Sequence, residues 1–292
     1  MRKQLIKTVE KLLLDDDKTV LLLGDIGVFG FRDSFKNIPD RTYNIGILEQ
    51  STVSLSSGLS KVGMIPFVHT IAPFLVERCL EQLKLDFGYQ NLNGNFISIG
   101  ASYDYTALGC THHCPGDIIT LSSIPNMEII VPGTSNEFNS LMLETYNNGS
   151  PTYFRLSEYE NSVNHDVKFG KGIKIKTGKM ATIICFGNML QKVLESTEGL
   201  DVTILYYTTI TPFDNELLLE NFNENIIVCE PFYEGSVNYY ITKALLGKKY
   251  SINNIGVPRE FLTKYGNYDT MDKYIKLDTE SIKERLLELC TI

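Results

Sequence analysis

The segment Asn44-Ile45-Gly46-Ile47-Leu48-Glu49-Gln50 lies at the centre of the stretch 42–132, which decides the fold. The apolar run 43–47 predicts a short strand, and the residues that follow predict a helix rich in small side chains. Glu49 is therefore expected where a strand passes into a helix. Binding sites in α/β proteins are commonly built at such junctions.

Strands and helices alternate on both sides of this segment. Upstream, the pattern predicts a helix over 3–14 and a strand over 19–23. Downstream, it predicts strands at 65–70, 95–99, 128–131 and 151–156, and helices at 74–88, 117–122 and 135–146. Alternation of this kind, with strands apolar on both faces, predicts a mainly parallel sheet covered by helices.

A second α/β unit is expected after a polar segment that contains Gly170, Gly172 and Gly178. It has predicted strands at 181–186, 202–207 and 225–229, and predicted helices at 189–198, 214–220 and 235–246. The expected fold class is α/β, with two mainly parallel three-layer domains. We place the domains at 1–163 and 179–292, joined by a linker at 164–178.

Length and charge limit the function. A chain of 292 residues can bury two cores, and 43% hydrophobic with 21% charged residues is ordinary for a globular protein. The net charge is −8, and Lys and Arg form no dense cluster. Nucleic acid and anionic membranes are therefore excluded as expected partners, which leaves small molecules and other proteins.

The start of the chain and the cysteines favour the cytoplasm. Residues 1–11 carry charges throughout, unlike an export signal, and no apolar run approaches the roughly 18 residues of a membrane span. The cysteines are scattered along the chain, as is typical of reduced thiols. They are Cys79, Cys110, Cys114, Cys185, Cys229 and Cys290.

A series of motifs follows Glu49 in a fixed order. They are Pro66-Phe67-Val68, Phe74 with Arg78, Gly109-Cys110-Thr111-His112-His113, Ile124-Pro125-Asn126-Met127 and Val131-Pro132. In this order they resemble the pyrimidine-binding domain of the transketolase family of thiamine-diphosphate enzymes. Phe213-Asp214 and Val228-Cys229-Glu230 resemble, more loosely, the C-terminal domain of that family. The resemblance implies that the first domain is pyrimidine-binding and the second transketolase C-terminal-like.

The resemblance implies that Glu49 is the catalytic acid that hydrogen-bonds a ring nitrogen of the cofactor's aminopyrimidine. This bond lets the cofactor form its own nucleophile. The alternative is that Glu49 simply favours the start of a helix, where acidic residues are common.

The resemblance also implies a set of residues that bind thiamine diphosphate: Ile47, Phe74, Arg78 and Asp25, besides Glu49. Phe74 is expected to stack on the pyrimidine. Ile71 or Leu75 are alternatives for the stacking residue, because this chain has one extra residue between Phe74 and Arg78, and Phe74 can also be a plain core residue. Asp25 can equally be a turn carboxylate. The segment 24–27 lacks the Lys-Ser/Thr of a phosphate loop.

His112 is implied at the reaction centre, where it would hydrogen-bond developing negative charge on oxygen. Arg2, His69, Tyr103 and Asp104 complete the expected substrate site together with His112. The run 110–114 also contains zinc-ligand types, but successive residues cannot easily converge on one tetrahedral ion.

Several positions depart from the transketolases that act on sugar phosphates. Phe29, Gly100 and Glu158 stand where those enzymes have phosphate-binding Ser, His and Arg, and Leu108 stands where they have an Asp. A carboxylate repels a phosphate. The expected substrates are therefore small keto or aldehyde compounds other than the standard pentose phosphates.

The family's Gly-Asp-Gly…Asn element, which holds a divalent metal and the diphosphate, is absent from the sequence. We therefore expect a companion N-terminal subunit that carries this element with Mg²⁺ or Ca²⁺, in an α2β2 assembly about a two-fold axis. The expected activity is transfer of a two-carbon ketol unit. The alternatives are a β subunit of a 2-oxoacid dehydrogenase or decarboxylase, and a non-catalytic scaffold subunit.

Overall fold

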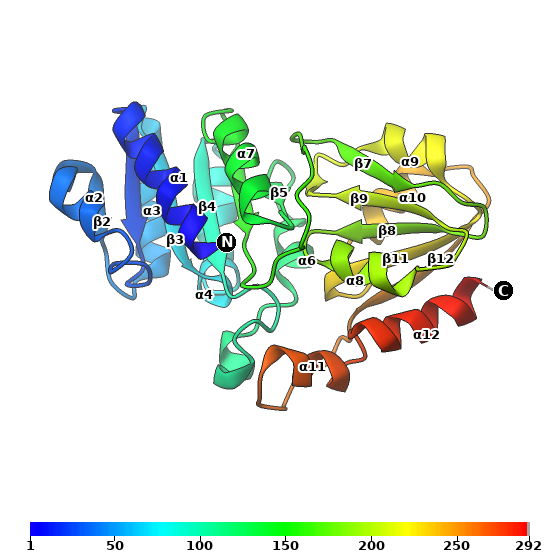
Figure 1. Cartoon of the computed structure of the whole chain (residues 1–292). Coiled ribbons are helices and arrows are strands. Elements are labelled where there is room, and N and C mark those ends of the chain that lie inside the picture. The colour runs from blue at the N-terminus through cyan, green and yellow to red at the C-terminus, as the bar shows by residue number, and fades with distance from the viewer. Residues whose placement is uncertain (291–292) are drawn as a thin grey trace.

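The computed structural model describes residues 1–290 and contains two sheets side by side, each with helices on both faces (Figure 1). Among these residues, no helix has the length and apolar character needed to cross a membrane.

The first sheet has the strand order β10-β5-β6-β4-β3-β1-β2. All its strands run parallel except β10, which is antiparallel to β5. The strands are β1 (Thr19–Leu23), β2 (Thr42–Asn44), β3 (Ile65–Ile71), β4 (Gly94–Ile99), β5 (Glu128–Ile130), β6 (Pro151–Arg155) and β10 (Thr209–Thr211).

Helices cover both faces of this sheet because each turns one apolar stripe toward it. On one face lie α1 (Arg2–Asp15) and α7 (Ser135–Thr145), which share a buried core. On the other lie α3 (Glu49–Lys61), α4 (Ala72–Val76) and α6 (Asp117–Leu121). The connections between these elements contain two short helices and four helical turns. The helices are α2 (Arg32–Asn37) and α5 (Leu80–Gln82), and the turns are η1 (Pro39–Arg41), η2 (Leu83–Gly88), η3 (Thr106–Leu108) and η4 (Cys110–His112).

The second sheet has the order β12-β11-β8-β9-β7, and only β7 is antiparallel to its neighbour. Its strands are β7 (Gly172–Lys176), β8 (Thr182–Phe186), β9 (Thr203–Tyr207), β11 (Asn225–Tyr233) and β12 (Ser251–Val257). Its helices are α8 (Met189–Ser196), α9 (Asn215–Asn221), α10 (Asn238–Ala244), α11 (Tyr268–Tyr274) and α12 (Thr279–Cys290). Both apolar core layers continue from the first sheet into the second.

Local structure differs from the sequence-based expectation in two places near Glu49. The expected strand 43–47 ends at Asn44, because the Asn44 side chain accepts a hydrogen bond from the Gly46 amide (3.1 Å) and Gly46 has φ +83°. The expected helix 74–88 is broken into α4, α5 and the π-helical turn η2. Helix α2 was not predicted.

The segment expected to be a linker, 164–178, contains β7, which pairs with β9 at the edge of the second sheet. Conversely, β10 comes from the second half of the sequence but pairs with β5 in the first sheet. The division into domains 1–163 and 179–292 stays our proposal, with part of that linker built into the second sheet.

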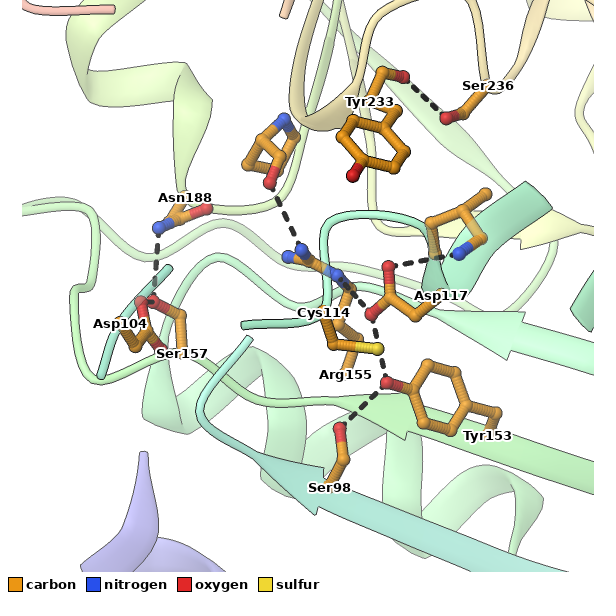
Figure 2. A network of polar contacts seen from close by, with 12 residues as sticks. Ser98, Asp104, Cys114, Asp117, Tyr153, Arg155, Ser157, Asn188, Tyr233 and Ser236 are labelled. Atoms are coloured by element: carbon orange, nitrogen blue, oxygen red, sulfur yellow. Dashed lines mark hydrogen bonds and ion pairs between the residues drawn. The ribbon is translucent and has the colours of Figure 1, made fainter. Parts of the chain in front are cut away.

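A buried ion pair lies in the first half at its junction with the second (Figure 2). Arg155 Nε donates to Asp117 Oδ2 (2.7 Å), and both side chains are almost completely buried. Asp117 also accepts from the Tyr153 hydroxyl, and Arg155 donates to the carbonyl of Pro231 in β11 (3.0 Å). The end of β6 is thus bonded directly to the second sheet.

Candidate active site

The neighbouring strands β1 and β3 form a topological switch point at their carboxyl ends. From β1 the chain continues to β2 toward one edge of the sheet, and from β3 it continues to β4 toward the other edge. Gly24 follows β1, and its amide donates to the His69 carbonyl (3.1 Å). A Cβ on Gly24 would lie 3.1 Å from Thr70 Cβ and 3.6 Å from Glu49 Cγ. Glycine therefore brings β1 close to Glu49 at the place where open α/β sheets bind ligands.

Glu49 stands in the first turn of α3 and is 3% exposed. A tight turn places it there, because the Leu48 amide donates to the Gly46 carbonyl (2.8 Å) and the Thr52 amide to that of Leu48 (2.9 Å). The carboxylate is thereby turned inward rather than left on the helix surface.

Asn44 holds this turn to the loop after β1. Its Oδ1 accepts from the amides of Asp25 (3.0 Å) and Gly46 (3.1 Å), and its Nδ2 donates to Asp25 Oδ1 (3.2 Å). Asp25 has φ +66°, a conformation that needs such support in a residue other than glycine. Sequence reasoning did not single out Asn44, although Asn two residues before Gly is a turn signal.

Four of the expected site residues meet in a chain of contacts. Arg78 Nη1 donates to Glu49 Oε2 (2.5 Å), and the Arg78 guanidinium lies 4.3 Å from the centre of the Phe74 ring. The Phe74 ring meets the His112 ring edge to face, with 5.4 Å between centres. Leu75 is fully buried in the core and Ile71 nearly so, whereas Phe74 is half-buried.

This geometry fits the aminopyrimidine of thiamine diphosphate. The Arg78 guanidinium is a flat group with N–H donors, and it meets the Phe74 face and the Glu49 carboxylate at the same time. A planar pyrimidine would lie on the same Phe74 face, with a ring nitrogen that accepts a hydrogen bond from the protonated Glu49 carboxyl group. Arg78 is 39% exposed, so it has room to move aside.

His69, on β3, has one nitrogen without a partner. Its Nδ1 donates to the Ile97 carbonyl (2.8 Å), which leaves Nε2 as a buried acceptor with no hydrogen bond. Burial lowers the pKa of His69 to about 4. The imidazole is therefore neutral at pH 7 and can accept a hydrogen bond.

Arg2 lines a cavity of about 340 Å³ beyond the ends of β4 and β6, together with Lys3, Ser135, Glu158 and Glu160. Besides burial, the charge of Arg2 contributes to the pKa values of His69 and Tyr105. Burial raises the pKa of Tyr105 to about 12. The cavity is lined by two bases and two acids, a mixed rather than a purely cationic surface.

Tyr103 and Asp104 have partners inside the protein and are not brought to the Glu49 group. The Tyr103 hydroxyl donates to Asp272 Oδ1 (2.6 Å). Asp104 accepts from the Ser157 hydroxyl (3.0 Å) and the Glu158 amide (2.9 Å), and burial raises its pKa to about 7. In this structure both residues anchor the loop after β4.

Ile47 lies beside the site but does not fill it. Its side chain is 68% exposed, and the neighbouring Leu48 is also exposed. Two exposed apolar side chains therefore immediately precede the buried Glu49 in the chain.

Within residues 1–290, no three His, Cys, Asp or Glu side chains are placed to hold a metal ion, and this includes the run 110–114. Cys110 is exposed, Cys114 is buried, and both His113 nitrogens are buried without a hydrogen-bond partner.

Comparison with known proteins shows the family of this chain. Residues 1–162 match the family described as transketolase, pyrimidine binding domain. The chain belongs to the transketolase family. The resemblance expected from Glu49, Phe74 and the Thr111-His112 motif is thus confirmed.

Relatives extend the similarity beyond the first half. The chain is 36% identical over 284 residues to an "Uncharacterized 33.6 kDa protein in fasciation locus" of Rhodococcoides fascians, covering 96% of this chain and 91% of that protein. It is 28% identical over 269 residues to a subunit of the apulose-4-phosphate transketolase of Actinobacillus succinogenes, covering 87% and 86%.

A solved structure shares the whole fold. It is described as a split gene transketolase, an inactive β4 tetramer, and it matches with a TM-score of 0.87 at 24% identity. The match covers 99% of this chain and 98% of that one. The predicted fold class, α/β with two mainly parallel sheets, is confirmed.

Proposed function

We propose that this chain is the pyrimidine-binding and C-terminal subunit of a split thiamine-diphosphate enzyme. It transfers a two-carbon ketol unit between small keto and aldehyde compounds. The observation that supports the proposal is the contact chain Glu49–Arg78–Phe74–His112, because it brings a buried carboxyl group, an aromatic face and an imidazole together.

Each residue has a role that its surroundings support. Glu49 holds the pyrimidine through a hydrogen bond, Phe74 supplies a flat face for it, and Ile47, Asp25 and Arg78 border the same place. Thiamine diphosphate, when bound, supplies the carbon nucleophile. His112 donates a hydrogen bond to the oxygen on which charge develops, and its ring is held edge-on by Phe74.

The outer end of the substrate site is formed by Arg2 and His69. His69 Nε2 is a buried acceptor and fits a substrate hydroxyl. The adjoining cavity adds Glu158 and Glu160 to Arg2 and Lys3, a set that suits a hydroxyl-rich end better than a phosphate. Tyr103 and Asp104 support the loop behind this site.

A companion chain supports the other end of the cofactor. It carries Mg²⁺ or Ca²⁺ with the diphosphate, and two copies of each chain form α2β2 in the cytoplasm. The exposed Ile47 and Leu48 beside Glu49 support this assembly, because a partner seated there would cover them and close the site. The names of the relatives, one a transketolase subunit and the other a split-gene transketolase, agree with such a division.

The test is a transfer reaction in the reconstituted complex with thiamine diphosphate and Mg²⁺. The donor is 3-hydroxypyruvate, which loses CO₂ and passes its remaining two carbons to an aldehyde, giving a ketose two carbons longer. We expect Glu49→Ala to lower the rate at least about 100-fold while the complex still assembles. An unchanged rate would remove Glu49 from the mechanism, and acyl transfer to a lipoyl group would favour a 2-oxoacid dehydrogenase instead.

A further inference from the structure

The loop 100–116, between β4 and α6, carries His112 and is folded mostly by its own backbone. The Cys114 amide donates to the Ser102 carbonyl (2.7 Å) and closes the loop at its base. Inside it, η3 and η4 meet at Gly109, which has φ +76°. The His112 amide donates to the Gly109 carbonyl (3.0 Å), so the turn at Gly109 sets the direction of His112.

The first end of this loop is held by α11 in the second half of the chain, which lies beside it in Figure 1. The Tyr103 ring stacks on Tyr268 with 5.0 Å between centres, and its hydroxyl donates to Asp272. Asp272 is paired in turn with Lys192 of α8. A capping box between Asn267 and Thr270 fixes the start of α11.

The last residues of the loop are also held by the second half. The Tyr233 amide donates to the Pro115 carbonyl (2.9 Å), and the Tyr233 ring lies against Gly116. Both ends of the loop are therefore tied to elements that follow β10.

Tyr265 completes this arrangement at the turn itself. A Cβ on Gly109 would lie only 2.6 Å from the Tyr265 ring, so the ring occupies the side-chain space of that glycine. Tyr265 is otherwise 71% exposed, so this contact does not serve to bury it in a core. The Tyr265 ring thus lies against the turn at Gly109, whose carbonyl accepts the hydrogen bond from the His112 amide.

We propose that Tyr265 is a positioning residue for His112, and that the segment 258–274 is the clamp through which the second half of the chain orders the reaction centre. Because His112 takes its role from the function proposed above, this inference rests on that function. Tyr265 acts through Gly109 and touches no substrate. Its ring restricts the turn between η3 and η4.

Hydrogen exchange in the full chain tests the contact without cofactor or substrate. We expect Tyr265→Ala to speed exchange of the Gly109 and His112 amides by about tenfold. Tyr265→Phe, which keeps the ring, should exchange like the wild type. Tyr239→Ala is the matched control, because Tyr239 is a similarly exposed tyrosine on α10, which packs in the opposite core layer from α11. Exchange within about twofold of wild type in Tyr265→Ala would overturn the proposal.

A double-mutant cycle tests the same contact from the other side. Gly109→Ala adds a methyl group that meets the ring, so its effect on exchange should be smaller in the Tyr265→Ala background than in the wild type. Additive effects would mean that the two residues do not act through one contact, and would overturn the proposal.

Turnover in the reconstituted complex then tests the positioning role. With 3-hydroxypyruvate as donor, we expect Tyr265→Ala to lower kcat about fivefold or more, with Tyr265→Phe restoring it and thiamine-diphosphate affinity unchanged. A normal kcat in a variant with fast His112 exchange would overturn the role. No turnover by the wild type would instead reject the proposed function, while the exchange result would still decide the contact.

Discussion

The ion pair between Glu49 and Arg78 holds the candidate site together in the absence of a ligand. The Glu49 carboxylate is almost fully buried, and its charged partner, Arg78, is partly exposed. Because Arg78 also lies on Phe74, a ligand that takes over both contacts would release an exposed cation instead of leaving a buried acid unpaired. The site is therefore organised before any ligand binds.

Glu230, in β11, gives the clearest pH-dependent prediction. Burial raises its pKa to about 8, and Oε2 has no hydrogen-bond partner. In the folded chain Glu230 keeps its proton up to about pH 8, whereas in the unfolded chain it loses the proton above its ordinary pKa of 4.5. Its contribution to the free energy of unfolding is therefore complete below pH 4.5 and is lost as the pH rises through 8. Between pH 5 and 8 the free energy of unfolding should fall by about 3 kcal/mol from this residue.

Glu230→Gln keeps the acceptor for Gly235 and Asn254 but does not titrate. Urea unfolding at pH 5 and pH 8 should show a smaller fall in the variant than in the wild type. The raised pKa of Asp104 also lowers stability as the pH rises, and the lowered pKa of His69 has the opposite effect. The test is therefore the difference between the wild type and Glu230→Gln in how far the free energy of unfolding falls. An equal fall in both proteins would contradict the assignment.

At the scale of elements, the junction between β2 and α3 positions Glu49. It is stabilised mainly by Asn44, whose side chain makes three hydrogen bonds to Asp25 and Gly46. These bonds link the loop after β1 to the turn that precedes Glu49.

Asn44→Ala should therefore loosen the site more than the fold. We expect a loss of about 1 kcal/mol in the free energy of unfolding, and about tenfold weaker thiamine-diphosphate binding in the complex. Asn148→Ala is the control, because Asn148 forms a similar turn with Ser150 far from the site. It should lose stability and keep its affinity, and the same outcome for Asn44→Ala would show that the junction does not position the cofactor site.

Several elements could be predicted from the sequence because their periodicity is strong. Strands such as 19–23 and 225–229 are continuous apolar runs, and both are buried as expected. The expected strand 43–47 was too long, because the Asn44 side chain competes with the sheet for the Gly46 amide. Strand β7 was missed, since it lies at a sheet edge and its residues are only partly buried.

The candidate site was predictable only in part for a related reason. Glu49, Phe74, Arg78 and His112 come together as their motif order implied. Tyr103 and Asp104 instead hydrogen-bond to residues inside the protein that lie far away in the sequence. Asp272 comes 169 positions after Tyr103, and Ser157 comes 53 positions after Asp104. Periodicity carries no information about such pairs.

At the scale of the whole molecule, the two sheets share both core layers and are tied together by Arg155. Arg155→Met removes the partner of a fully buried Asp117, which should lower the free energy of unfolding by roughly 3–5 kcal/mol. Unfolding should stay a single transition, because the halves share their core.

Lys171→Met is the matched control, since the Lys171 side chain is 59% exposed and pairs with the exposed Glu216 as well as with Asp214. It should leave the unfolding transition unchanged. A loss in Arg155→Met no larger than in this control would show that Arg155 does not stabilise the junction between the halves.

We expect this chain to hold only one end of the cofactor. Calorimetry with thiamine diphosphate and Mg²⁺ tests it most directly, first with this chain alone and then with the proposed companion chain, which would carry the Gly-Asp-Gly…Asn element. The account predicts no measurable binding to the chain alone and tight binding to the mixture. Tight binding to the chain alone would contradict the split site, because the diphosphate and its metal would then have to be held by residues of this chain.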